Sequence, residues 1–305
     1  MLFEDDRYDL ELAMSKTREF VARDEVVAIF GGLTSSRTMA IGLVTNSSGL
    51  AVVSLTSTAN SIFVGRENIF PTSFKDEQQG DALALYMRET LHKKKAALLY
   101  ASTDAYSSSL AQTFAGAFER LGGKLAITRT FTQGETNFTP TLQDIKAASP
   151  DFIFAPVYAT EIALIARQAK SLGIASSMLV GGDGWGNEVL LHGSTADLEG
   201  AVFANHYATD APGERNARFV AAFRAAYGAL PSVVNAAAYD GANVLANAIH
   251  QTRTPSRASV KVALNETKNY DGVTGTISFV NHVLRKPVFI VKIVGGNFRY
   301  VTAIP

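Results

Sequence analysis

The first two-thirds of the chain repeat one pattern: a short apolar run, a polar turn, then a longer stretch with helical spacing. The apolar runs cover residues 26–30, 51–55, 96–100, 152–155 and 178–180. Runs that are apolar on both faces are typical of parallel strands buried between helices. Strands that alternate with helices predict an α/β fold with doubly wound parallel sheets, in which ligands bind at the carboxyl ends of the strands.

Four stretches, one before the first run and three between the runs, carry apolar residues at the spacing of one helix face. They cover residues 10–21, 83–91, 110–121 and 162–172. Gly122 and Gly173 directly follow two of them, and glycine readily adopts the left-handed conformation that closes a helix. These stretches are therefore predicted to be helices with defined ends.

The last third of the chain has a different organisation. Two consecutive helices are predicted at 218–227 and 235–250, followed by a Gly- and Thr-rich β segment at 270–279. The runs 288–294 and 298–302 flank a Gly295-Gly296-Asn297 turn, a strong hairpin signal. No low-complexity linker interrupts the chain, so any domains are expected to be connected by short hinge strands.

Length and composition narrow the range of functions. A chain of 305 residues favours two domains over one. Its 28 basic and 28 acidic side chains balance, so no electrostatic footprint for nucleic acid or anionic lipid is expected. Cysteine is absent, which excludes disulfides, thiolate zinc sites and cysteine nucleophiles. No apolar run approaches the roughly 18 residues that span a bilayer, and the start of the sequence shows no signal-peptide pattern.

Two neighbouring strands are followed by loops rich in hydroxyl groups. Residues 31–36 contain two glycines followed by Thr34 and Ser35, and residues 54–60 include Thr56 and Thr58. Each loop alone could be a strand-to-helix turn with a serine N-cap. Together they would offer several donors to one carboxylate, and charge-assisted hydrogen bonds contribute roughly 1.5–3 kcal/mol each.

A third loop, at residues 181–187, places Asp183 two residues before Trp185, the only tryptophan. An acid beside a large aromatic ring can hold a ligand ammonium by ion pairing and cation–π contact. A turn with a packed tryptophan is the structural alternative. A phosphate loop is disfavoured because the glycine spacing differs and no P-loop lysine follows. Tyr106 and Tyr158 follow two other strands and could contact the apolar body of a ligand or pack in the core.

Catalytic and metal-binding motifs are not found in the sequence. The histidines show no metal-ligand spacing and are interpreted as surface or packing residues: His92, His192, His206, His250 and His282. No GxSxG elbow is present. The sequence therefore predicts no metal, no cofactor and no enzymatic activity.

The chain resembles the periplasmic leucine/isoleucine/valine-binding proteins of ABC transporters. The family's motifs occur in the same order along nearly the whole chain. Each motif alone is weak evidence, but the ordered set is specific. The motifs are Glu4-Asp5-Asp6, the strand and loop at 27–35, Asp104-Ala105-Tyr106, residues 168–173, Gly182-Asp183-Gly184-Trp185, Ala238-Tyr239-Asp240-Gly241-Ala242 and residues 272–279.

The resemblance implies a type I periplasmic-binding fold, in which two α/β lobes are joined by three hinge crossovers and close on a ligand. Lobe 1 would comprise residues 1–74 and 206–278, and lobe 2 residues 75–205 and 279–305. The residues that match the family's binding site divide by role. Ser35, Thr56 and Thr58 would bind the ligand carboxylate, Asp183 its ammonium, and Tyr106 and Tyr158 would come from the second lobe.

Several positions depart from the family pattern. Leu55 stands where proline is common, Ser107 where glycine is usual, and Asp183 where some members carry glutamate, which changes the depth of the pocket. Family members begin about 40 residues earlier, with a signal peptide, a first strand and a first helix. The chain is therefore expected to lack that strand and helix of lobe 1, and the strand expected near its start would end close to Glu4.

The sequence thus predicts an extracytoplasmic protein, periplasmic or extracellular. It would bind a branched-chain or related amino acid and deliver it to an ABC transporter permease. The protein is expected to be a monomer that binds no nucleic acid. A ligand-sensing domain for amides, urea or aromatic carboxylates is the alternative, and an enzyme on a doubly wound sheet is the least favoured interpretation.

Overall fold

The computed structural model describes residues 1–187, 190, 195–279, 284 and 286–305. The chain forms two compact units. Unit 1 comprises Met1–Lys75 and Val234–Lys286, and unit 2 comprises Asp76–Val233 and Pro287–Pro305. The chain therefore passes between the units three times, as expected for this fold. The lobe limits inferred from the sequence stay a prediction.

Unit 1 contains a three-stranded parallel sheet in the order β1-β2-β3. Its strands are β1 (Ala28–Phe30), β2 (Ala51–Ser54) and β3 (Ile69–Pro71). A separate antiparallel pair joins β9 (Tyr270–Gly272) to β10 (Gly275–Ile277). The sequence pattern predicted β1, β2 and the β9–β10 segment. It missed β3, because the apolar run there is limited to Ile69–Pro71 and ends in a proline, which is uncommon in central strands.

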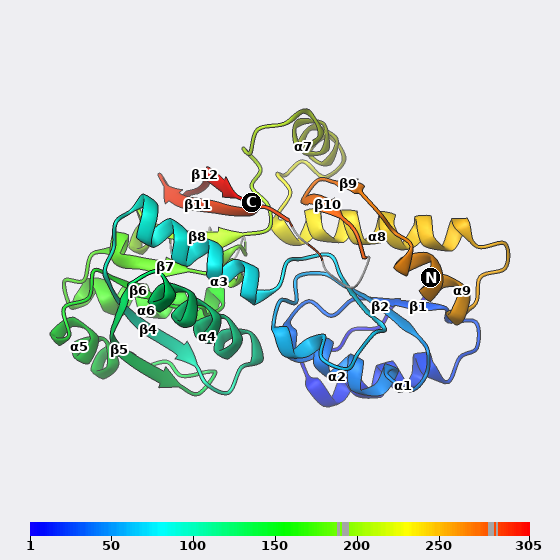
Figure 1. The fold of residues 1–305 in the computed structure, drawn as a ribbon, viewed down its shortest axis with the longest axis horizontal. Helices are drawn as coiled ribbons and strands as arrows, with labels where there is room; N and C mark the ends of the chain where they lie inside the picture. The colour runs from blue at the N-terminus through cyan, green and yellow to red at the C-terminus, as the bar shows by residue number, and fades with distance from the viewer. Residues whose placement is uncertain (188–189, 191–194, 280–283, 285) are drawn as a thin grey trace. The chain divides into compact units, whose positions relative to one another are not determined.

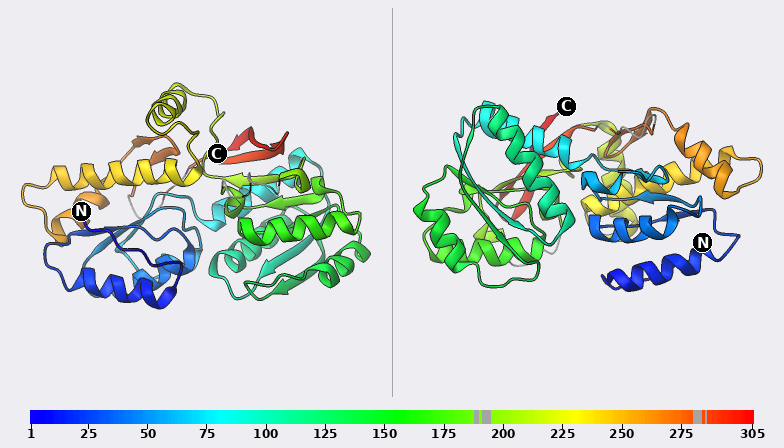
Figure 2. Two further views of the ribbon diagram at one scale, coloured as in Figure 1. Left: turned by 180° about the vertical axis from the view of Figure 1, so that it is seen from behind. Right: turned by 60° about the horizontal axis from the view of Figure 1, so that its bottom comes forward.

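Helices cover both faces of the three-stranded sheet. On one face, Phe70 of β3 packs with residues of α8 (Val233–Gln251) and α9 (Arg257–Asn265). On the other, Ile69 lies against Gly42 of α2 (Ser35–Thr45). α1 (Leu10–Val21) packs against α2. Figure 2 shows this layering within unit 1 from two further directions.

The acidic residues near the start form a turn instead of a strand end. Residues 1–6 contain no strand, so the expectation of a strand ending near Glu4 was wrong. The carboxylates of Asp5 and Asp6 each accept a hydrogen bond of 2.9 Å, from the backbone N–H groups of Arg7 and Tyr8 respectively. Such local bonds are typical of Asx-turns, which compete with extended structure.

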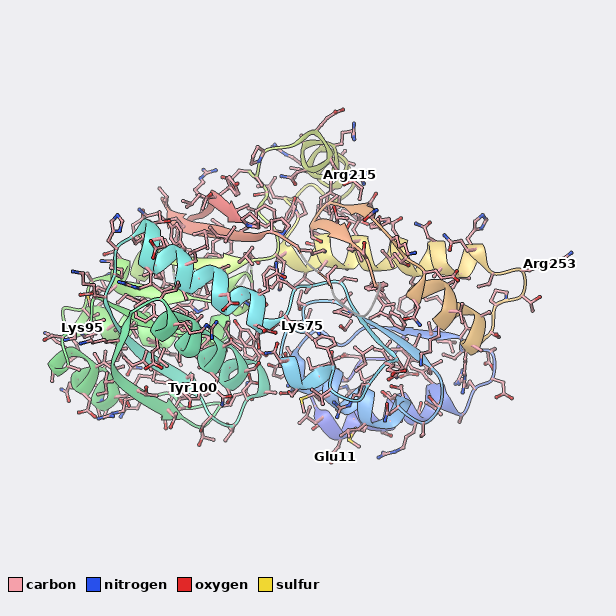
Figure 3. All side chains as sticks on the ribbon, viewed as in Figure 1. Glu11, Lys75, Lys95, Tyr100, Arg215 and Arg253 are labelled. Carbon is pink, nitrogen blue, oxygen red and sulfur yellow. The ribbon has the colours of Figure 1, made fainter. Side chains whose placement is uncertain are left out.

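Unit 2 contains a seven-stranded sheet in the order β12-β11-β8-β7-β6-β4-β5. The five strands from β8 to β5 are parallel, and β11 and β12 are added antiparallel beside β8. Figure 3 labels Lys95 and Tyr100, which lie towards opposite ends of β4. The strands are β4 (Lys95–Ala101), β5 (Lys124–Phe131), β6 (Phe152–Phe154), β7 (Leu179–Gly181), β8 (Val202–Asn205), β11 (Val288–Val294) and β12 (Asn297–Ile304).

The helices of unit 2 lie on both faces of its sheet (Figure 1). Successive residues of β6 show this: the Phe154 ring lies 4.1 Å from that of Phe114 on α4, whereas Ile153 packs with Ile145 of α5 and Ile162 of α6. The predicted doubly wound arrangement is therefore confirmed. The helices are α3 (Asp76–Leu85), its π-helical continuation η2 (Tyr86–Thr90), α4 (Ala105–Arg120), α5 (Thr139–Ala147), α6 (Ala159–Ser171) and α7 (Glu214–Tyr227).

Glycines close several of these elements as the sequence predicted. Gly122 and Gly173 follow α4 and α6 with φ of 75° and 71°. Gly295 and Gly296 join β11 to β12 with φ of 57° and 75°, which is the left-handed backbone that a two-residue hairpin loop requires. In the described part of the chain, no helix is both long enough and apolar enough to cross a membrane.

A buried polar network in unit 1 joins segments beside two of the three crossings. Asp240 on α8 accepts bonds from the N–H groups of Val273 and Thr274, both at 2.9 Å, and from Thr274 Oγ1 at 2.6 Å. Lys286 Nζ donates to Thr274 Oγ1 and to the carbonyl of Thr72. Because Thr72 and Lys286 precede the first and third crossings, the network fastens both connecting segments to α8.

Lys286 should make the stability of the protein depend on pH in the alkaline range. Its burial lowers its pKa to about 8 from an ordinary 10.5, although the charge of Asp240 raises it. Between these values the unfolded state binds more protons than the folded state, so stability rises with pH. Urea denaturation measures this effect. Between pH 7 and 9.5, the free energy of unfolding of the wild type should rise by about 2 kcal/mol relative to that of Lys286→Met.

The exposed Lys292 on β11 supplies the matched control, because Lys292→Met removes a solvated ammonium instead of a buried one. This variant should follow the wild-type profile throughout. If the stability of Lys286→Met varied with pH in the same way as that of the wild type, the pKa of Lys286 would not be lowered by folding.

Candidate functional site

The two hydroxyl-rich loops of unit 1 are bonded to each other. They follow β1 and β2, which are neighbouring parallel strands. Ser35 Oγ accepts bonds from the N–H groups of Thr58 and Ala59 at 3.3 and 3.2 Å. Thr56 Oγ1 donates to the carbonyl of Leu33 at 2.6 Å. The structure therefore brings Ser35, Thr56 and Thr58 together, as the sequence predicted.

These hydroxyls differ in what they can still offer to a ligand. Ser35 accepts two bonds and keeps its own O–H to donate, whereas the Thr56 hydrogen is used by Leu33. Thr58 Oγ1 is buried and has no hydrogen-bond partner in the part of the chain that the structure describes. A buried hydroxyl without a partner costs about 1–3 kcal/mol, so Ser35 and Thr58 are the donors best suited to an anionic ligand group.

The start of α2 adds to this preference for an anion. Its N-cap is Thr34, not the serine considered in the alternative interpretation, and the Thr34 side chain makes no capping bond. The N-terminal amides of a helix carry partial positive charge and bind carboxylates or phosphates well. This end of unit 1 thus combines a helix N-terminus with two donor hydroxyls.

In unit 2, three predicted residues lie together beyond the carboxyl ends of β4, β6 and β7, which are adjacent strands. Tyr106 lies in the first turn of α4, Tyr158 caps α6, and Asp183 begins the short helix η4 (Asp183–Trp185). The two tyrosine rings lie 5.1 Å apart, and Tyr106 Oη accepts a bond of 2.9 Å from the N–H of Gly184. The cluster therefore lies beyond the carboxyl ends of parallel strands, where ligands are expected in such sheets.

Asp183 is held on both carboxylate oxygens by residues that the sequence analysis missed. Oδ1 accepts a bond of 2.8 Å from Gln79 Nε2, while the Asp183 N–H donates to Gln79 Oε1 at 2.9 Å. Oδ2 lies 3.0 Å from His206 Nε2. Gln79 belongs to α3 and His206 follows β8, so no local motif connects either residue to Asp183.

The placement of His206 corrects its interpretation as a surface or packing residue. Its side chain is 1% exposed and paired with an acid, whereas His92 and His250 lie at the surface. His192 and His282 fall outside the described residues. Among the residues that are described, no three His, Asp or Glu side chains are grouped as metal ligands.

Trp185 belongs to the hydrophobic core of unit 2. Its side chain is fully buried, and Nε1 donates to the carbonyl of Ala155 at 3.1 Å. A direct cation–π contact with a ligand is therefore not available in this structure, which corrects the sequence-based interpretation of Trp185. The indole instead anchors the loop that carries Asp183.

The glycines around Asp183 permit close packing of that loop. A Cβ on Gly182 would lie 2.5 Å from Tyr106 Oη and 2.8 Å from Gln79 Oε1, and one on Gly184 would lie 2.9 Å from Tyr106 Cε1. All three distances are shorter than real Cβ atoms allow. The glycines flanking Asp183 are thus needed for the hydrogen bonds that fix it.

Tyr106 stays protonated at any physiological pH. Its burial, followed by the negative charges of Asp183 and Asp76, raises the pKa of its hydroxyl well above the ordinary value. The phenol therefore accepts from Gly184 and retains a hydrogen to donate. Ser107, which departs from the family pattern, also has a structural role: its Oγ accepts from the Ala101 N–H and donates to the Pro156 carbonyl.

This architecture defines a class of protein: two α/β units, connected by three chain crossings, with polar residues gathered beyond the carboxyl ends of their parallel strands. Residues 1–297 match the family model of the periplasmic binding proteins. The chain belongs to this family of periplasmic binding proteins.

Individual relatives support the same assignment. Leu/Ile/Val-binding protein homolog 3 of Brucella melitensis is 25% identical over 281 residues, covering 91% of this chain and 74% of the relative. The crystal structure of the leucine-binding protein LivK from Thermotoga maritima is 27% identical with a TM-score of 0.93, covering 98% of this chain and 86% of that chain. LivJ from Streptococcus pneumoniae, solved with isoleucine, is 28% identical with a TM-score of 0.91, covering 99% and 86%.

Replacing the Tyr106 hydroxyl should destabilise unit 2. Tyr106→Phe leaves the Gly184 N–H without its acceptor, and a lost buried hydrogen bond costs about 1–3 kcal/mol. Chemical denaturation measures this loss. Tyr227→Phe, which alters a 72% exposed tyrosine, should change stability by less than about 0.5 kcal/mol. Equal stability of Tyr106→Phe and wild type would show that the bond contributes nothing.

Proposed function

We propose that this protein binds a branched-chain or closely related amino acid and delivers it to an ABC transporter. The observation that carries the proposal is chemical: donor hydroxyls gather in unit 1, and a hydrogen-bonded carboxylate lies among two tyrosines in unit 2. An α-amino acid carries the two complementary groups. Membership of the family and the amino acid ligands named for its relatives support the same ligand class.

The ligand carboxylate would be bound in unit 1. Ser35 and Thr58 supply side-chain donors, and the first turn of α2 supplies favourable backbone charge. Each charge-assisted hydrogen bond contributes roughly 1.5–3 kcal/mol. Three or four of them account for much of the roughly 8 kcal/mol that corresponds to a micromolar dissociation constant.

The ligand ammonium would be bound in unit 2 by Asp183. Its carboxylate uses one direction for Gln79 and one for His206, and a carboxylate offers about four lone-pair directions. Tyr158, which is half-buried beside Tyr106, offers an aromatic surface to an aliphatic side chain.

Several further attributes belong to this proposal. The protein acts outside the cytoplasm, in the periplasm or at the cell surface, as a monomer that docks on a membrane permease. It binds its ligand without chemical conversion and is not an enzyme. The described cluster around Asp183 has the composition of a recognition site: an acid, an amide, an imidazole and two phenols.

Thr58→Val should separate ligand binding from stability. The substitution replaces a hydroxyl that is buried without a partner in the described structure, so the free protein should be as stable as wild type or more stable. The affinity for L-leucine, L-isoleucine or L-valine should fall about tenfold or more, because one carboxylate donor is lost. Calorimetry gives the affinity, and thermal unfolding without ligand gives the stability.

Thr45→Val is the matched control. Thr45 Oγ1 is also buried, but it donates to the Ile41 carbonyl and accepts from Asn68 Nδ2. This variant should lose stability and keep its affinity, the reverse of Thr58→Val. A screen in which amides or aromatic acids raise the melting temperature, and branched-chain amino acids do not, would contradict the proposed ligand class.

A further inference from the structure

The acid of the candidate site, Asp183, lies within hydrogen-bond distance of a buried imidazole. His206 directly follows β8, and its side chain is 1% exposed. Its Nε2 lies 3.0 Å from Asp183 Oδ2, while Gln79 occupies Oδ1. All three residues belong to unit 2, so this arrangement is defined within one compact body.

We infer that His206 is a specificity-determining residue that makes recognition of a ligand ammonium by Asp183 depend on pH. The inference rests on the proposed function, because it concerns the same ligand group. With a neutral imidazole, Asp183 carries an uncompensated negative charge and attracts an ammonium. With a protonated imidazole, that charge is already balanced inside the protein.

The physical basis is competition between two cations for one carboxylate. Opposite charges attract strongly where water is excluded, and two like charges beside the same acid repel each other. Histidine is the side chain whose ordinary titration falls between pH 5 and 8. A protein with protonated His206 would therefore have to release that proton, or tolerate a second positive charge, when it binds an amino acid.

Neighbouring elements contribute other titratable groups around Asp183 and His206. Asp76 on α3 is fully buried, and its charge, together with that of Asp183, acts on Tyr106 of α4. Tyr158 lies against Tyr106. Tyr106 is neutral over the relevant range, because burial and the nearby negative charges raise the pKa of its hydroxyl well above the ordinary value. Asp183 and Asp76 are thus the carboxylates around the cluster, and His206 is its imidazole.

The sign of the effect follows from proton linkage. Ligand binding that displaces a proton from His206 becomes weaker as pH falls, by at most about tenfold per pH unit for one proton. A ligand with the same carboxylate and side chain but no ammonium does not compete with the proton. The cluster would therefore discriminate amino acids from simple carboxylates more strongly at neutral than at acidic pH.

Calorimetric titration with L-leucine between pH 5.5 and 8 tests the inference. Wild type should lose about fivefold to tenfold in affinity at the acidic end. His206→Gln keeps an N–H donor without a titratable proton and should show a flat profile. His250→Gln, at an exposed position of α8, should retain the wild-type profile. Wild type should also release up to one proton per leucine, measured in two buffers of different ionisation enthalpy, which needs no variant.

The ligand 4-methylpentanoate, which matches leucine without its ammonium, should bind wild type without this pH dependence. A pH-independent leucine affinity in wild type, or an unchanged dependence in His206→Gln, would overturn the role of His206. The same pH dependence for 4-methylpentanoate would overturn it too, by assigning the effect to the carboxylate end. Failure of leucine, isoleucine and valine to bind at every pH would instead overturn the proposed function, and the inference with it.

Discussion

A nearly buried carboxylate needs hydrogen-bond partners on both oxygens, and this requirement at Asp183 organises much of unit 2. An unpaired charge in such a position is strongly destabilising, whereas one held by several donors is tolerated. Gln79 contacts it from α3 and His206 from directly after β8, and Trp185 anchors its loop to Ala155, which follows β6. Elements that are distant in sequence therefore meet around one acid, and the flanking glycines leave the space they need.

Both units contain parallel strands, but the side chains at the strand ends favour ligand groups of opposite charge. In unit 1, the strand ends carry hydroxyls and a helix N-terminus, which favour negative charge. In unit 2, the strand ends carry an acid and phenols, which favour positive charge beside an apolar body. A zwitterion with an aliphatic side chain matches this pair of preferences better than a simple cation or anion does.

Much of this arrangement could be predicted from the sequence, because buried parallel strands produce apolar runs and their following loops carry the polar residues. The same logic failed where the signal is weak. The exposed edge strand β5 shows no continuous apolar run, β3 is a three-residue run that ends in Pro71, and the capping box that begins α9 was overlooked. Gln79 and His206 could not be identified, since their roles arise from tertiary contacts across 104 and 23 residues. Trp185 looked like a ligand contact because sequence alone cannot distinguish a buried aromatic from an exposed one beside a functional acid.

The position of that tryptophan has a practical consequence. The chain contains a single indole, and it lies two residues from Asp183 in the interior of unit 2, bonded to Ala155 directly after β6. All tryptophan emission from this protein therefore originates from one known environment beside the recognition loop. Changes in its emission wavelength or lifetime would report rearrangement at that loop and the core around it, so the molecule carries a site-specific optical probe without any chemical labelling.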